Sequence, residues 1–188
     1  DEVRDAEVLY GRGDAVAAGA PFMLIASALR RSAGLDGCVD ERAQLDAYVA
    51  RALTDPAVRA RHLPLLGVLA GVHFDDAASE ILRSARSDPE LLAEAVKNAF
   101  VAWLKALAKP TLIVLEDVHW GDVPSLRLIE SALALLSERP LLLLALARNL
   151  LPAERSARDG TWSRSPFFWV PGHPMIELGS RRLGIVGH

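Results

Sequence analysis

The stretch from Thr111 to Asp122, T-L-I-V-L-E-D-V-H-W-G-D, decides the fold class of this 188-residue chain. An aliphatic run ends abruptly in two adjacent carboxylates, Glu116 and Asp117, and Pro110 precedes it. A run without polar alternation predicts a strand buried on both faces of a parallel sheet. Because open α/β sheets bind ligands at the carboxyl ends of their strands, we expect the two acids to lie at a functional edge.

Two carboxylates in this position have two interpretations. In the first, they serve a Mg²⁺-nucleotide: one acid holds the metal, often through water, and the other orients the attacking water. In the second, the acids face solvent and cap the next helix. The local pattern leaves both interpretations open.

The residues that follow predict a strand, a helix and a second strand. Pro124 can open a helix with Asp122 as its cap, and apolar residues keep helical spacing as far as Leu136. A second buried strand is expected at Leu141 to Ala147, and it ends in Arg148. Since such a crossover is right-handed, Arg148 should lie at the same sheet edge as the two acids.

The upstream part of the chain predicts one more strand and many helices. Glu7 to Tyr10 reads as a short strand, with Gly11 to Asp14 as its exit turn. Up to five helices then precede Thr111, at about 21–32, 41–53, 56 onward with an interruption at Pro64, 76–87 and 90–108.

The motif L-I-V-L-E-D-V-H-W-G-D-x-x-S, followed by L-L-A-L-A-R, resembles the Walker B and sensor 1 region of the STAND branch of the AAA+ P-loop ATPases. Within that branch it is similar to large bacterial signalling ATPases, which are often fused to Ser/Thr kinase, cyclase or helical-repeat domains. The upstream V-L-Y-G-R-G-D and A-P-F-M-L-I-A-S-A-L-R-R resemble the second strand and following helix of that family. The resemblance covers roughly residues 6 to 150.

This resemblance implies a P-loop NTPase-like parallel sheet with many helices, and it implies ATP and Mg²⁺ as cofactors. Glu116 takes the Mg²⁺-binding Walker B position. Asp117 takes the neighbouring position that polarises water and also faces the Mg²⁺. Arg148 takes the sensor 1 position, which contacts the nucleotide during catalysis.

One departure from the family pattern concerns the phosphate-binding loop. No G-x-x-x-x-G-K-[ST] motif is present, and none of the lysines, Lys97, Lys105 and Lys109, follows a glycine. In the family this loop lies just before the second strand, so we expect a fragment of a longer ATPase that lacks the first strand and the P-loop. The alternative is a non-catalytic interaction or regulatory module that keeps the fold without binding nucleotide.

Composition and charge limit the classes of binding partner and the cellular compartment that we expect for this protein. A net charge of −3 gives no electrostatic case for nucleic acid. No apolar run reaches membrane-spanning length, the single Cys38 suits a reducing compartment, and the first residues do not form a signal peptide, so we expect a cytoplasmic protein. The expected partners are ATP, effector or repeat domains in the parent chain, and a second copy through self-association.

The expected domain organisation is a partial ATPase domain at residues 1–150 and a tail at 151–188. The tail holds nine glycines and prolines from residue 152 onward, together with Trp162, Phe167, Phe168 and Trp169. This composition is typical of irregular structure. Met175 to Leu178 is a candidate for a short last strand.

Overall fold

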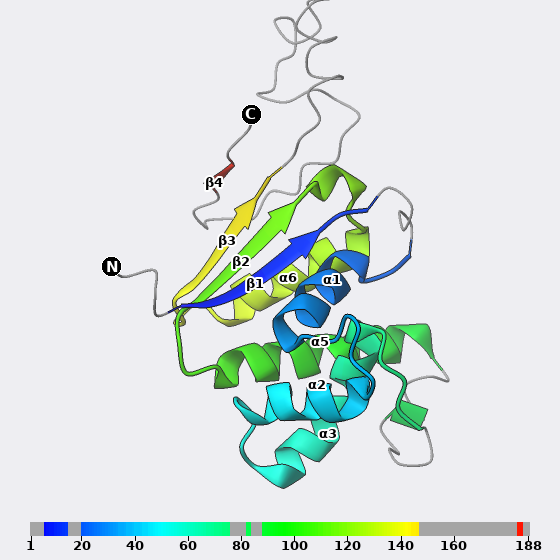
Figure 1. The fold of residues 1–188 in the computed structure, drawn as a ribbon. Coiled ribbons are helices and arrows are strands. Elements are labelled where there is room, and N and C mark those ends of the chain that lie inside the picture. Colours follow the sequence, from blue (N-terminus) through cyan, green and yellow to red (C-terminus); the bar gives the residue numbers. More distant parts are fainter. Residues whose placement is uncertain (1–5, 15–19, 76–81, 84–87, 147–183, 186–188) are drawn as a thin grey trace, which may run out of the picture.

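The computed structural model describes residues 6–14, 20–75, 82–83, 88–146 and 184–185. They form an α/β fold (Figure 1). The elements in chain order are β1 (Glu7–Arg12), α1 (Met23–Ala33), α2 (Glu41–Ala50), α3 (Pro56–Ala70), α5 (Pro89–Ala106), β2 (Thr111–Glu116), the 3₁₀ helix η3 (Val118–Trp120), α6 (Val123–Leu135), β3 (Leu141–Ala145) and β4 (Gly184–Ile185).

The sheet has the strand order β1-β2-β3-β4, and each neighbouring pair is parallel. In register, Glu7 lies opposite Thr111, and Thr111 lies opposite Leu141. The predicted parallel pairing of the three longer strands is therefore confirmed. The carboxyl ends of β1 and β2 meet at one edge, where Arg12 lies opposite Glu116.

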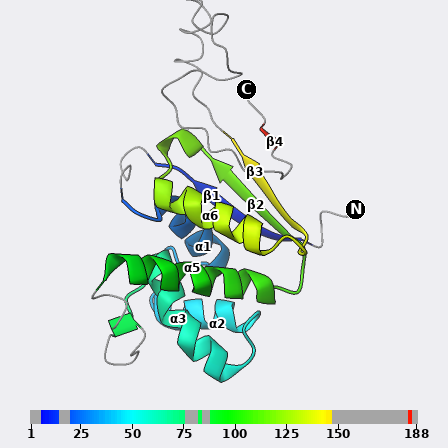
Figure 2. The ribbon, with the colours of Figure 1, turned by 180° about the vertical axis from the view of Figure 1, so that it is seen from behind.

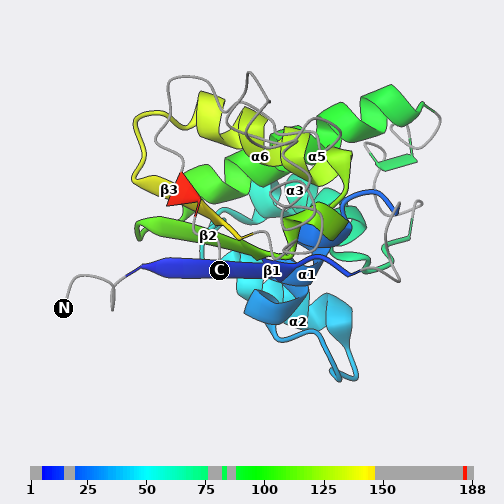
Figure 3. The ribbon, with the colours of Figure 1, turned by 90° about the horizontal axis from the view of Figure 1, so that it is seen from above.

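The described helices cover one face of the sheet. Helices α1 and α6 lie directly against it, and α5, α3 and α2 form a further layer behind them (Figures 1 and 2). In the view from above, β1, β2 and β3 lie side by side (Figure 3). All crossovers between β1, β2 and β3 thus run over the same face, as the right-handed rule requires when the strand order advances in one direction.

Burial along the strands follows this one-sided arrangement. Leu9, Ile113 and Leu143 point into the core under the helices and are buried. Their neighbours point to the other face, where Val8 is 43% exposed and Leu142 is 55% exposed. The expectation of burial on both faces is therefore wrong for the described residues, because no described element packs on the second face.

Four helices begin at a capping aspartate, and one of these, Asp122, is the cap predicted above. The side chains of Asp40, Asp55, Asp88 and Asp122 accept hydrogen bonds from backbone N–H groups in the first turns of α2, α3, α5 and α6. These bonds satisfy donors that a helix leaves unpaired at its beginning. At the other end, Gly34 stops α1 in a left-handed conformation with φ 66°, where glycine has no steric cost.

Three local expectations need correction. Helix α3 continues through Pro64, which is buried within it, so packing against the core outweighs the lost hydrogen bond. Strand β1 extends to Arg12, because Gly11 and Arg12 keep pairing with β2. Strand β3 ends at Ala145. The expected helix at 76–87 and strand at 175–178 fall largely or wholly outside the described residues.

The core joins the two helical layers to the sheet. Its largest fully buried side chains are Trp103 and Phe100 of α5, whose ring centroids lie 6.0 Å apart. The ring of Tyr48 from α2 lies 5.7 Å from that of Trp103. In the described part of the chain, no helix has the length and apolar composition needed to cross a membrane.

Candidate functional site

The predicted acids lie at the carboxyl edge of the sheet, at the end of β2. Glu116 is the last residue of the strand, and its carbonyl accepts a hydrogen bond of 2.8 Å from the N–H of Gly13. Asp117 follows with φ 53°, a left-handed conformation that is uncommon for residues other than glycine. This bend turns the chain from the strand into η3 and places the Asp117 side chain on the side facing β1.

Asp117 is held by an arginine from the neighbouring strand. The Arg12 Nε lies 2.9 Å from Asp117 Oδ2. The Asp117 side chain is only 11% exposed, whereas that of Arg12 is 63% exposed. The hydrogen bond with Asp117 raises the pKa of Arg12, and the charge of Asp117 adds to this effect. One carboxylate of the site is therefore ion-paired within the described structure.

Glu116 belongs to a second polar group, on the face of the sheet that no described helix covers. Its side chain is half-buried, and its hydrogen bond with Tyr10 is the main reason that the pKa of Tyr10 is raised. The guanidinium of Arg31 from α1 lies 4.5 Å from the Tyr10 ring centroid, a cation–π geometry. The two acids thus have different partners: Asp117 pairs with Arg12, and Glu116 interacts with Tyr10.

Asp122 is the most extensively bonded carboxylate at this edge. Its Oδ1 accepts from the N–H groups of Phe22 and Ser125, both at 2.7 Å. Its Oδ2 accepts from the N–H of Leu24 at 3.1 Å and from the Ser125 hydroxyl at 2.8 Å. Asp122 therefore caps α6, as predicted, and also caps α1, which has no side-chain cap of its own.

Two glycines allow the backbones to approach each other here. A Cβ on Gly13 would lie 2.3 Å from the carbonyl oxygen of Asp117, and a Cβ on Gly11 would lie 2.5 Å from that of Leu24. Both distances are shorter than any real contact, so glycine lets β1 lie close to α1 and to the Asp117 turn. The two glycines that flank Arg12 therefore allow close packing of the backbone, and Arg12 itself supplies the charged side chain.

Apolar side chains are also exposed at this edge. Met23, Trp120 and Val123 are 40%, 46% and 48% exposed. Trp120 is the last residue of η3, directly after the two acids. Met23 and Val123 occupy the first positions of α1 and α6.

Sequence reasoning found some of these residues and missed others. Glu116, Asp117 and Asp122 lie at the predicted edge. Arg12 was assigned to an exit turn, although its place at the end of a parallel strand was the signal that it would face the acids. Arg148, the predicted sensor 1 residue, lies outside the described residues, so its position relative to the acids stays a prediction.

The donor set suits one mode of Mg²⁺ binding. Among the described residues, no group of three or more His, Cys, Asp or Glu side chains is arranged to hold a metal ion. Mg²⁺ in nucleotide sites commonly uses one or two carboxylates together with water and substrate phosphates. Glu116 and Asp117 provide carboxylates of the kind that bind Mg²⁺ together with water and phosphate oxygens. They do not supply a complete set of protein ligands for the ion.

Comparison with known proteins gives no assignment. No protein-family model, curated protein or solved structure matches this chain.

Proposed function

We propose that this chain is part of an ATP-binding and ATP-hydrolysing signalling ATPase of the cytoplasm, with a P-loop NTPase-like fold. The single observation that carries the proposal is the pair Glu116 and Asp117 at the carboxyl end of a parallel strand. In this function Glu116 holds Mg²⁺, Asp117 orients and polarises the attacking water, and Arg148 contacts the terminal phosphate. The nucleotide state then controls an effector domain or self-association of the parent protein.

The surroundings of the two acids support this proposal. Parallel α/β sheets bind ligands in the crevice beyond the carboxyl ends of their strands. The N-termini of α1 and α6 point to the same edge, and Asp122 ties them together. Helix N-termini carry a partial positive charge that favours anions, and at α1 and α6 the Asp122 carboxylate already accepts from the N–H groups of Phe22, Leu24 and Ser125.

A second function, a non-catalytic interaction or regulatory module, has an observation of its own. Asp117 is ion-paired to Arg12 and nearly buried. An acid that orients water must be able to reach it, and the Asp117 carboxylate faces Arg12 instead of solvent. In this second function the Arg12–Asp117 pair simply fastens β1 to the turn after β2.

The experiment compares the 188-residue chain with a longer gene product that includes the segment upstream of Asp1. The chain alone should bind ATP weakly or not at all and show no hydrolysis above background, because backbone N–H groups and the lysine of a P-loop supply most phosphate affinity. The longer product should bind and hydrolyse ATP. Isothermal titration calorimetry and phosphate release measure the two properties.

The Asp117→Asn variant of the longer product separates the two functions. It should lose hydrolysis by about 100-fold or more and largely keep ATP binding, because the amide keeps the shape but cannot accept a proton. Asp14→Asn, an acid on the loop after β1, is the matched control and should leave the rate within about twofold. A longer product that neither binds nor hydrolyses ATP would favour the interaction module, and an active Asp117→Asn enzyme would remove the assigned role.

A further inference from the structure

The carboxyl edge holds a charged contact that the ATPase function must rearrange. Arg12 Nε donates a hydrogen bond of 2.9 Å to Asp117 Oδ2, so the carboxylate faces the guanidinium instead of solvent. The proposed function, however, requires Asp117 to reach a water molecule. One of the two side chains must therefore give up this contact when a nucleotide binds, and their surroundings indicate which one.

The Asp117 side of the contact is held in place. Asp117 is buried, and its carbonyl accepts a hydrogen bond of 2.9 Å from the N–H of Trp120. The N–H of the next residue, Val118, donates to the carbonyl of Leu146 at 3.2 Å. Gly13 also packs so closely against the Asp117 carbonyl that a Cβ would not fit between them. Asp117 therefore cannot turn away from Arg12 without disturbing the turn after β2.

The contacts of Arg12 hold its backbone and leave its side chain at the surface. The Arg12 N–H donates to Ser27 Oγ at 2.9 Å, and the Arg12 carbonyl accepts from the same hydroxyl at 3.3 Å. The side chain is 63% exposed. The described contact with Asp117 uses only Nε of a guanidinium that has several N–H donors. The arginine side chain is therefore the part of the contact that can move.

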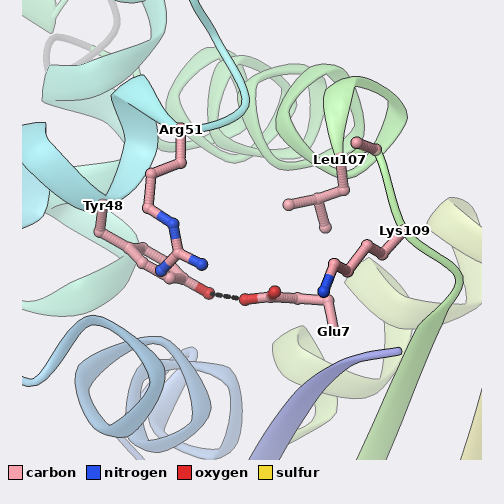
Figure 4. A pocket seen from close by; sticks show the side chains of 6 residues that line it. Glu7, Tyr48, Arg51, Leu107 and Lys109 are labelled. Carbon is pink, nitrogen blue, oxygen red and sulfur yellow. Dashed lines mark hydrogen bonds between the residues drawn. The ribbon is translucent and has the colours of Figure 1, made fainter. Parts of the chain in front are cut away.

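The opposite edge of the sheet, where the strands begin, shows a fixed contact for comparison. There the Tyr48 hydroxyl donates a hydrogen bond of 3.1 Å to Glu7 Oε1 (Figure 4). Tyr48 is 6% exposed, and its ring centroid lies 5.7 Å from that of Trp103. The tyrosine cannot leave Glu7 without disturbing the core, whereas the exposed side chain of Arg12 can turn while the core stays intact.

A phosphate group competes well for such a side chain. Arginine binds phosphate through two parallel hydrogen bonds, and these charge-assisted bonds are among the strongest in proteins. An ion pair with an exposed partner contributes little net stability, so it is easily exchanged. The Arg12 guanidinium lies within one hydrogen bond of Asp117. The terminal phosphate on which Asp117 acts in the proposed function is therefore within reach of the Arg12 side chain.

We propose that Arg12 senses the terminal phosphate of ATP: its guanidinium exchanges Asp117 for that phosphate when ATP binds, and it stays with Asp117 when ADP is bound. The exchange frees the Asp117 carboxylate for water. This inference rests on the ATPase function proposed above, and it adds Arg12 to Arg148 as a residue that contacts the terminal phosphate. Arg12 thereby makes the carboxyl edge distinguish ATP from ADP.

The test measures how the longer gene product binds a non-hydrolysable ATP analogue and ADP, by isothermal titration calorimetry. Arg12→Gln should weaken binding of the analogue about tenfold and change ADP binding by less than about twofold, because only the analogue carries the third phosphate. Arg12→Lys keeps a charge but cannot form two parallel bonds, so it should weaken analogue binding by about threefold. Arg61→Gln, at an exposed position of α3, is the control and should bind both nucleotides as the parent does.

The Nε–H signal of Arg12 in ¹⁵N NMR spectra follows the exchange in the parent protein itself. The signal is assigned by its absence from the spectrum of either Arg12 variant. It should be the same in the nucleotide-free and ADP-bound forms and should shift when the analogue binds.

The outcomes separate this inference from the function on which it rests. Equal losses of analogue and ADP binding in Arg12→Gln, or an Arg12 signal that does not change when the analogue is bound, would overturn the exchange and leave the ATPase function intact. A longer product that binds no nucleotide would remove the ATPase function and the role of Arg12 together.

Discussion

At the scale of single residues, Asp122 connects more of the structure than any other carboxylate described at the carboxyl edge. Four hydrogen-bond donors from two helices converge on its two carboxylate oxygens. The residue is only 7% exposed. A buried charge is tolerated when hydrogen bonds replace the lost water. The negative charge also lies at two helix N-termini, where the helix dipoles favour it. Asp122 therefore fixes the position of α1 relative to α6.

Replacing Asp122 should therefore destabilise the protein strongly. Asp122→Ala leaves buried N–H groups without acceptors at both helices, and we expect a loss of about 3 kcal/mol in the free energy of unfolding. Asp88→Ala is the control, because Asp88 caps only α5 with one bond to the N–H of Glu90, and it should cost about 1 kcal/mol. Urea denaturation measures both. Equal losses would mean that the bonds to α1 contribute nothing.

The partly buried imidazole of His62 favours its neutral form in the folded protein. Its Nδ1 is buried without a hydrogen-bond partner in the described structure. Burial, with a smaller contribution from Arg61, lowers the pKa of His62. A lowered pKa means that the unfolded chain binds the proton more readily, so stability is present above the unfolded value of about 6.5 and is lost as pH falls through the folded value.

His62→Gln should make stability less dependent on pH between about 7 and 5, because glutamine does not titrate. His73→Gln, at an exposed position near the end of α3, should keep the dependence of the parent. Urea midpoints measured across this pH range show the difference. Identical pH profiles for His62→Gln and the parent would contradict the assigned role of burial.

At the scale of elements, α3 shows how packing overrides a local signal. Pro64 cannot donate a backbone hydrogen bond, and its ring crowds the preceding turn. The helix nevertheless runs from Pro56 to Ala70, and its second half contributes Leu65, Leu66 and Leu69 to the core. Burial of about three leucines is worth several kcal/mol, which exceeds the cost of about 3 kcal/mol for one interior proline.

The strain at Pro64 should be removable. Pro64→Ala restores one N–H and relieves the crowding, while it loses some buried apolar area and gains flexibility in the unfolded chain. We expect a net gain of about 1 kcal/mol in the free energy of unfolding. Pro56→Ala is the control at the first turn, where no N–H is needed, and should change stability by less than about 0.5 kcal/mol. A Pro64→Ala variant less stable than Pro56→Ala would refute this account.

Helix α1 also forms hydrogen bonds with the outer edge of β1. The edge of β1 that faces away from β2 is bonded by serines of α1: Ser27 Oγ accepts from the Arg12 N–H at 2.9 Å, and Ser32 Oγ donates to the Val8 carbonyl at 3.4 Å. Covering an edge in this way blocks further strand pairing on that side. Helix α1 therefore positions the strand that carries Arg12 to the site.

At the scale of the whole molecule, the sheet has one face under helices and one face with half-exposed aliphatic side chains. Parallel sheets in most proteins are covered on both faces. Leu142 and Leu143 are neighbours on β3 but lie on opposite faces, with exposures of 55% and 7%. They form a matched pair for testing this asymmetry.

Leu143→Ala should lose about 3 kcal/mol of stability, because it leaves a cavity under the helices. Leu142→Ala should lose less than about 1 kcal/mol, because its side chain is already in contact with water. Urea denaturation of the two variants provides the comparison. A loss at Leu142 as large as that at Leu143 would show that the second face is covered in solution.

The sequence by itself determined the local features of this protein. Aliphatic runs at 111–115 and from 141 predicted two strands of one parallel sheet, since their composition and the helix between them allow little else. The caps at Asp40, Asp55 and Asp122 could also be read directly, because a cap bonds to residues only two or three positions away.

Only the tertiary structure decided the contacts between distant segments. The Arg12–Asp117 ion pair joins residues 105 positions apart, and the second cap formed by Asp122 joins segments about 100 positions apart. Such contacts depend on strand register and helix docking, which local periodicity does not encode. The same holds for Pro64 and for the uncovered sheet face, because core packing and the side on which each crossover runs are properties of the assembled fold.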